Sequence, residues 1–135
     1  MMLSETVLVV ALTLFGEVRG ESTGAKRAVA SVIWNRSFGK SDSFRAVCME
    51  PYQFSCWNGK SYEKYYREVT KLVSANKIEK RAWDECLAIA GEMVTGDFAP
   101  TTEAKFYHTN AVHPRWSHNM VLVSVIGDHR FYKLG

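Results

Sequence analysis

The first half of the chain places apolar residues at helical spacing, interrupted by short polar segments. An apolar run over residues 3–18 predicts a helix that is enclosed on most sides, with Ser4 as its N-cap. A second helix is predicted over residues 23–38, where apolar positions recur every three to four residues. A short third helix is expected over residues 43–49, because Pro51 prevents its continuation.

The second half predicts two more helices and then a change of pattern. Residues 62–73 and 79–94 are amphipathic, and Gly96 is the expected C-cap of the latter helix. Short β-favouring runs follow at 105–109, 120–126 and 129–132, the last two separated by a turn. We therefore expect an α+β fold that is mainly α, with a small antiparallel β element near the C-terminus.

Length and charge narrow the class of protein. The 135 residues suit one domain, 1–135, and an apolar content of 47% with three prolines is typical of an ordered globular chain. Seventeen basic and fourteen acidic residues give a net charge of +3, and the basic residues are scattered among acidic ones. This pattern disfavours nucleic acid as a partner and leaves an anionic polymer, such as a bacterial cell wall, open.

The N-terminal apolar run does not have the features of a targeting segment. Glu5 precedes it, no Lys or Arg does, and no small-residue cleavage site follows, so we expect no signal peptide. No stretch approaches the roughly twenty apolar residues that span a bilayer, so no stable membrane insertion is expected. The three cysteines, Cys48, Cys56 and Cys86, lack a CxxC spacing and are expected to be free thiols.

The sequence FGEVRGE ends the first apolar run with two carboxylates. Glu17 and Glu21 are four residues apart and share a neighbouring face if the helix continues that far. Such a pair favours acid–base chemistry on a glycosidic bond, whose oxygen leaves poorly until it is protonated. Gly16 and Gly20 leave space for a backbone or a ligand. The alternative is a surface helix end with salt bridges through Arg19.

The loop over residues 51–59 combines aromatic and amide side chains without helical or strand periodicity. Such side chains offer flat apolar surfaces for sugar rings and hydrogen bonds for hydroxyl and N-acetyl groups. The alternative is a loop that anchors its aromatic residues in the core. The candidate substrate-binding residues from this loop are Gln53, Phe54, Ser55 and Trp57.

The four histidines lie in the last quarter of the chain, at positions 108, 113, 118 and 129. No HExxH motif or zinc-spaced set of Cys and His is present, and Pro114 and Trp116 interrupt any helix that could align them. We therefore expect no metal and no cofactor.

Six segments, in this order along the chain, resemble the SleB/CwlJ-type cell wall hydrolase family of spore cortex-lytic enzymes and their phage-encoded relatives. They are FGEVRGE, AVASVIWNR, QFSCWN, AKFYH, PRW and IGDHRFY. The resemblance implies a lysozyme-like, lytic transglycosylase-like helical domain that acts on the glycan strands of peptidoglycan. It puts Glu17 at the position of the catalytic acid and Glu21 at a supporting position. Tyr107 and His108 are expected to flank the acid or to orient the substrate.

The expected reaction is lytic transglycosylation between N-acetylmuramic acid and N-acetylglucosamine. Glu17 would protonate the glycosidic oxygen and then accept the proton of the muramoyl 6-hydroxyl. Three different functions stay open. A muramidase would use a second carboxylate, from Glu21, Glu50 or Asp128. A Cys/His amidase or endopeptidase would use Cys56 with His108, and a wall-binding module would have no activity.

The lack of a signal peptide and of an appended wall-binding domain predicts the biological setting. We expect a monomeric phage or prophage endolysin that is made in the host cytoplasm and reaches the cell wall after release. A virion-associated enzyme is the second possible setting.

Overall fold

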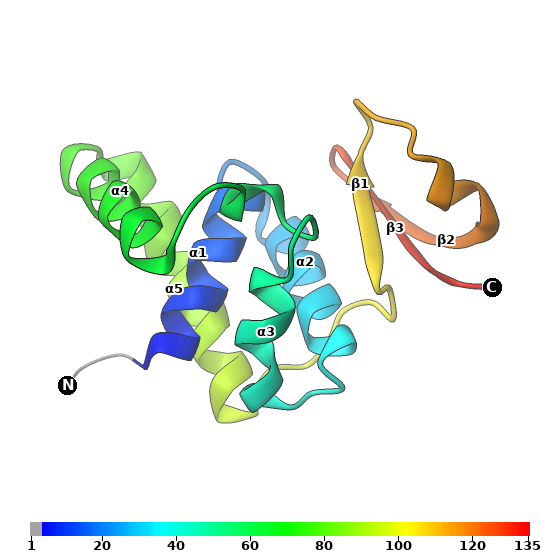
Figure 1. The fold of residues 1–135 in the computed structure, drawn as a ribbon, viewed down its shortest axis with the longest axis horizontal. Coiled ribbons are helices and arrows are strands. Elements are labelled where there is room, and N and C mark those ends of the chain that lie inside the picture. Colours follow the sequence, from blue (N-terminus) through cyan, green and yellow to red (C-terminus); the bar gives the residue numbers. More distant parts are fainter. Residues whose placement is uncertain (1–3) are drawn as a thin grey trace.

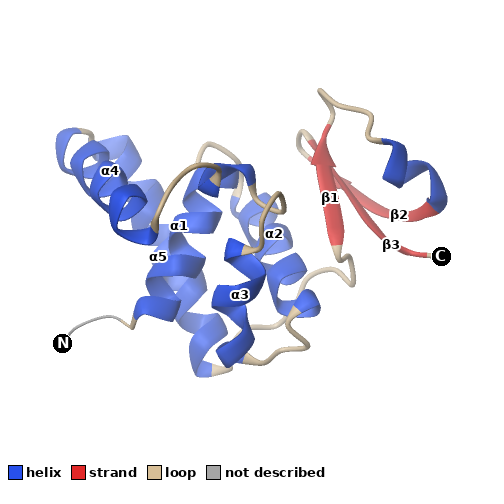
Figure 2. Ribbon diagram, viewed as in Figure 1, coloured by secondary structure: helices blue, strands red, loops and turns tan. Residues whose placement is uncertain are grey.

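The structure is a computed structural model that describes residues 4–135. Within this range, five α-helices precede a three-stranded antiparallel sheet, as Figures 1 and 2 show. The expected mainly α fold with a C-terminal antiparallel β element is confirmed. The elements are α1 (Glu5–Val18), α2 (Thr23–Arg36), α3 (Phe44–Met49), α4 (Tyr62–Ala75), α5 (Lys77–Thr95), β1 (Phe106–Thr109), β2 (Met120–Ile126) and β3 (His129–Leu134).

Helix α1 is the centre of the helical body, because α2, α3, α4 and α5 all pack against it. Its apolar run from Val9 to Phe15 is fully buried, so burial rather than helix propensity stabilises it. The predicted N-cap is confirmed, since the Ser4 hydroxyl accepts the N–H of Val7 at 3.2 Å. The predicted first residue, Leu3, lies outside the described residues.

The C-terminal end of α1 separates the two glutamates. The helix ends at Val18, and Glu21 lies in the following turn, where its N–H donates to the carbonyl of Val18 at 2.9 Å. The condition for Glu17 and Glu21 to share a helix face is therefore not met. Any cooperation between them depends on tertiary contacts instead.

Local signals define the other helix ends. Ser22 and Ser61 cap α2 and α4 through their hydroxyls, and Asn76 caps α5. Gly96 ends α5 with a φ of 87°, which confirms the predicted C-cap. Helix α2 ends at Arg36, two residues earlier than predicted, because the chain turns through left-handed conformations immediately afterwards.

The sheet stands beside the helical body with the order β1-β3-β2 (Figure 1). The linker from α5 is fastened to α2 by Asn35, whose side-chain amide donates to the carbonyls of Thr102 at 2.8 Å and Ala104 at 2.9 Å. Asn35 therefore acts as a structural lock, and β1 is held facing α2. None of the helices described is both long and apolar enough to cross a membrane.

Candidate active site

Glu17 lies in the last turn of α1 and receives hydrogen bonds from two distant parts of the chain. The hydroxyl of Tyr107, on β1, donates to Oε1 at 2.5 Å. The backbone N–H of Cys56, in the 51–59 loop, donates to Oε2 at 3.3 Å. Both carboxylate oxygens are thus held by donors, which fixes the direction of the side chain.

The environment of Glu17 keeps its two neighbouring acidic groups protonated. Burial raises the pKa of the Tyr107 hydroxyl well above its ordinary value, and the charge of Glu17 adds to the effect. Burial likewise raises the pKa of the Cys56 thiol, again with a contribution from Glu17. Tyr107 is therefore protonated, and a hydrogen-bond donor, throughout the physiological pH range. Cys56 is a poor nucleophile, because its thiol is not ionised to a thiolate.

Gly16 provides the space that brings the loop against α1. A Cβ at this position would lie 2.1 Å from the Tyr65 hydroxyl and 2.4 Å from the Cys56 Cβ. Of the two alternatives, close approach by the chain itself or by a ligand, the loop therefore takes the space beside the Gly16 Cα. Gly20 has no heavy atom within 4 Å of such a Cβ.

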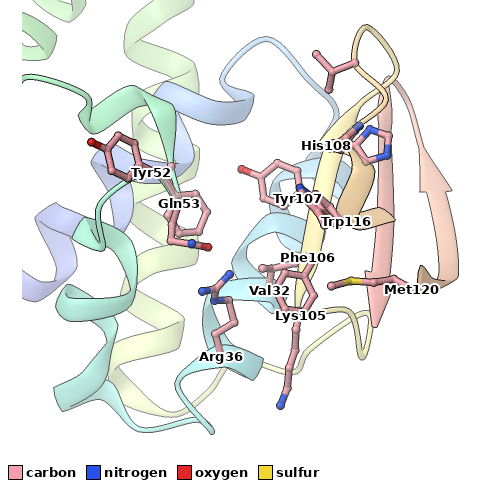
Figure 3. Close-up of a pocket in the computed structure, with 13 residues that line it drawn as sticks. Val32, Arg36, Tyr52, Gln53, Lys105, Phe106, Tyr107, His108, Trp116 and Met120 are labelled. Atoms are coloured by element: carbon pink, nitrogen blue, oxygen red, sulfur yellow. The ribbon is translucent and has the colours of Figure 1, made fainter. Parts of the chain in front are cut away.

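Two hollows flank the contact between Glu17 and Tyr107. The first has a volume of about 480 Å³ and lies between α2, the 51–59 loop and β1 (Figure 3). The second has a volume of about 800 Å³ and lies between the end of α1 and the β2–β3 turn. Because Tyr107 lines the first hollow and Glu17 lines the second, their hydrogen bond lies between the two hollows.

The walls of the two hollows differ in chemistry. The first is lined mainly by aromatic and cationic side chains, including Arg36, Tyr52, Phe54, Phe106, Tyr107 and Trp116. The second is lined mainly by polar and charged ones, including Glu17, Arg19, Glu21, Asn110, Asp128 and His129. The hydrogen bond between Glu17 and Tyr107 therefore has mainly aromatic walls on one side and mainly polar walls on the other.

Of the four candidate residues in the 51–59 loop, two line the first hollow and two line neither hollow. Gln53 is exposed and Phe54 is buried, and both line the first hollow. The Phe54 ring lies 6.3 Å from that of Tyr107. Ser55 is exposed but lines neither hollow.

Trp57 lines neither of these two hollows. Its side chain is 7% exposed, its indole N–H donates to the Thr13 hydroxyl at 2.9 Å, and its ring packs edge-on against Tyr65 at 5.0 Å. This position corrects the expectation that Trp57 offers a surface to sugar in the groove. Its ring instead anchors the loop in the core.

His108 lies in the wall of the first hollow with both ring nitrogens engaged. Nδ1 lies 2.8 Å from the carbonyl of Thr109, and Nε2 lies 2.8 Å from the Tyr132 hydroxyl. Because a carbonyl only accepts, Nδ1 carries the proton and Nε2 accepts from Tyr132. His108 therefore has no free lone pair with which to deprotonate Cys56.

The three carboxylates that could act as a second catalytic group lie in different surroundings. Glu50 pairs with Arg36 at 3.2 Å and lines neither hollow. Glu21 lies 3.5 Å from Nδ1 of His129, and Asp128 lines the second hollow. Among the residues that the structure describes, no group of three or more His, Cys, Asp or Glu side chains is arranged to hold a metal ion.

Sequence reasoning missed several residues of the first hollow. Tyr52 is 93% exposed at its rim. Phe106 and Trp116 form its far wall, with ring centroids 5.9 Å apart. Arg36 stacks over Phe106 at 5.4 Å. The sequence segments YQF and PRW could have indicated part of this wall, because exposed aromatic residues beside turns are typical of binding surfaces.

Fold and site together define a largely helical domain with a groove around one anchored carboxylic acid. The sequence profile of the cell wall hydrolase family matches residues 20–132, and the chain belongs to that family. The matched range includes Glu21 and Tyr107 and begins just after Glu17. The resemblance seen in the sequence motifs is thus confirmed.

Two solved structures share this fold. The catalytic domain of the germination-specific lytic transglycosylase SleB from Bacillus anthracis has 24% identity and a TM-score of 0.65, with 98% of this chain and 97% of that chain covered. The catalytic domain of the Bacillus cereus SleB protein has 25% identity and a TM-score of 0.60, with coverages of 96% and 90%. No curated protein sequence matches this chain.

Proposed function

We propose that this chain is a lytic transglycosylase that cleaves peptidoglycan glycan strands between N-acetylmuramic acid and N-acetylglucosamine, with Glu17 as the only acid and base. The observation that carries the proposal is the position of Glu17 in the wall of the second hollow, with one carboxylate oxygen bonded to Tyr107 in the wall of the first and the other to the Cys56 N–H. The lytic transglycosylase named among the structural relatives supports the same reaction class.

The proposed reaction needs one carboxyl group in two protonation states. Protonated Glu17 donates to the glycosidic oxygen as the bond from that oxygen to C1 of the muramoyl residue breaks. The muramoyl 6-hydroxyl oxygen then bonds to C1, and its proton passes to the Glu17 carboxylate. The products are a free 4-hydroxyl on one strand and a 1,6-anhydro-muramoyl end on the other. The donors Tyr107 and Cys56 stabilise the intermediate carboxylate.

The surroundings of the remaining carboxylates support transglycosylation over hydrolysis. A retaining hydrolase needs a second carboxylate about 5 Å from the acid, and an inverting one needs a base that activates water. Glu21 is turned towards His129 and Glu50 towards Arg36. Asp128 is the remaining candidate for a muramidase, because it lines the second hollow.

The experiment is digestion of purified peptidoglycan followed by mass spectrometry of the soluble products. We expect anhydro-muramic ends from the wild type and a loss of about 10²- to 10⁴-fold in rate for Glu17→Gln, the range of general acid–base catalysis. Glu63→Gln, an exposed carboxylate on α4, is the matched control. Muramic acid at free reducing ends, without anhydro ends, would contradict the proposal and would show that the chain is a hydrolytic muramidase.

The same assay tests for a Cys/His amidase and for a wall-binding module. Cys56→Ser should keep its activity, because a protonated thiol and an engaged His108 do not form a nucleophile–base pair. Pelleting with insoluble peptidoglycan without release of soluble fragments would indicate a wall-binding module.

The setting as a phage or prophage endolysin stays a prediction. Lysis of cells only after their membrane is permeabilised would support it.

A further inference from the structure

His129, the first residue of β3, has an unusual buried environment. Its side chain is 6% exposed, and its ring lies 5.6 Å from that of Tyr107 and 6.3 Å from that of Phe131. Within residues 4–135, its buried Nδ1 finds no hydrogen-bond partner. The Glu21 Oε1 lies 3.5 Å from it, within ion-pair distance but without making a hydrogen bond. Since buried polar atoms are nearly always paired, this near-contact calls for a function.

Both sides of this contact are fixed by the fold. The Glu21 backbone N–H donates to Val18 at 2.9 Å, and its carbonyl accepts from the buried ammonium of Lys26 at 2.9 Å. On the sheet side, Gly127 has a φ of 55°, and a Cβ there would lie 3.1 Å from Glu21 Oε1. The β2–β3 turn therefore presses directly against the Glu21 carboxylate.

Tyr107 is the link between this contact and Glu17. Its ring packs against His129 on one side and Phe131 on another, at 5.6 Å from each. Its hydroxyl makes the 2.5 Å hydrogen bond to Glu17. The direction of that hydroxyl therefore depends on where the ring is held, and His129 is one of the groups that hold it.

We propose that Glu21 and His129 form a carboxylate–imidazole pair that positions Tyr107 and, through it, the catalytic acid. The inference rests on the proposed function, in which Glu17 is that acid. Glu21 and His129 are positioning residues and do not touch the reacting atoms. The pair requires a donor on Nδ1 of His129 and an acceptor oxygen at position 21.

This requirement separates a positioning role from a catalytic one. Glu21→Gln keeps an acceptor oxygen, so we expect its kcat to stay within about threefold of the wild type. Glu21→Ala removes the acceptor and should lower kcat about 10- to 100-fold with KM within about twofold, because small misplacements of a catalytic group cost up to about 10²-fold. Equal loss in both variants would make Glu21 a catalytic carboxylate and overturn the inference.

A double-mutant cycle tests whether the effect passes through Tyr107. In a Tyr107→Phe background the hydrogen bond to Glu17 is already gone, so Glu21→Ala should lower kcat less than about twofold further. Fully additive losses would contradict the inference. Glu103→Ala, which removes an exposed pair with Lys133, is the matched control and should leave kcat and thermal stability unchanged.

Proton NMR gives a readout that does not depend on activity. A short hydrogen bond from a phenol to a carboxylate shifts the hydroxyl proton far downfield, and Tyr107→Phe identifies the signal. We expect Glu21→Ala and His129→Leu to shift or broaden it, and Glu21→Gln to preserve it. An unchanged signal in Glu21→Ala would overturn the inference even in an active enzyme. Full activity of Glu17→Gln would instead disprove the proposed function. The NMR comparison of the Glu21 and His129 variants would still test the positioning pair.

Discussion

The hydroxyl of Tyr107 and the carboxylate of Glu17 are joined by a 2.5 Å hydrogen bond across ninety positions of sequence. The bond connects the sheet to the end of the central helix, between the two hollows. The small β element thereby completes the site that the helical body begins. The sheet, which contributes little to the main core, has its clearest function in holding this donor.

We predict that Tyr107→Phe lowers kcat about 10- to 100-fold and leaves the fold intact. A hydrogen bond to a charged group contributes about 1.5–3 kcal/mol, and this one stabilises the Glu17 carboxylate formed when the acid gives up its proton. Steady-state kinetics on soluble glycan fragments would measure the change. Tyr66→Phe, on the surface of α4, is the control. Unchanged kcat in Tyr107→Phe would mean that the bond is structural only.

We predict that Gly16→Ala destabilises the protein by about 1–3 kcal/mol, the usual cost of overpacking. The new methyl would overlap the Tyr65 hydroxyl and the Cys56 Cβ, and the loop that donates to Glu17 would have to shift. Activity should therefore fall together with the thermal midpoint. Gly20→Ala, with open space around it, should leave the thermal midpoint unchanged. An unaltered melting curve for Gly16→Ala would contradict the close packing of this loop on α1.

The helices could be predicted because their signals are local. Ser4 and Gly96 end helices through contacts with residues only a few positions away in the sequence. The apolar spacing of α1 is likewise recognisable within a few helical turns. The relation between Glu17 and Glu21 could not be predicted in this way. Helical spacing suggested a shared face, but the chain leaves the helix after Val18, and tertiary contacts then give each carboxylate its own partner.

The loop residues show a second limit of sequence reasoning. Phe54 and Trp57 have the same chemical character and lie three positions apart, yet one lines the first hollow and the other reaches Thr13 in the core. Nothing in the local pattern distinguishes an aromatic ring that meets a ligand from one that anchors a loop. The choice depends on the space beside Gly16 and on the packing of α4, which only the folded chain defines.

We predict that Gln53→Ala raises KM about 3- to 10-fold and changes kcat little. Gln53 is exposed at the wall of the first hollow, where a side-chain amide can bind substrate. Within the described residues, the hydrogen bonds to Glu17 come from Cys56 and Tyr107 and not from Gln53. Loss of one hydrogen bond to substrate costs about 1 kcal/mol. Ser55→Ala, which lines neither hollow, is the neighbouring control. A fall in kcat at constant KM would assign Gln53 to the chemical step.

We predict that the native cysteines resist thiol reagents and that their ionisation destabilises the fold at high pH. Burial raises the pKa values of Cys48 and Cys86 to about 12 each, whereas an unfolded thiol titrates near about 8.5. Raised pKa values favour the folded state below about pH 8.5, and this contribution is lost as the pH rises towards 12, because the unfolded chain ionises first. Labelling with Ellman's reagent at pH 8 should be slow for folded protein and rapid in denaturant.

The measurement that isolates this effect compares urea unfolding at pH 7 and pH 10 for the wild type and for Cys86→Ala. The wild type should lose more stability over this interval, because the variant has one fewer thiol that ionises only on unfolding. Cys86 is fully buried on α5, so the variant should also be less stable at both pH values through the loss of packing. The informative quantity is therefore the difference between the two pH values within each protein. Equal differences would mean that the Cys86 thiol titrates alike in the folded and unfolded chain.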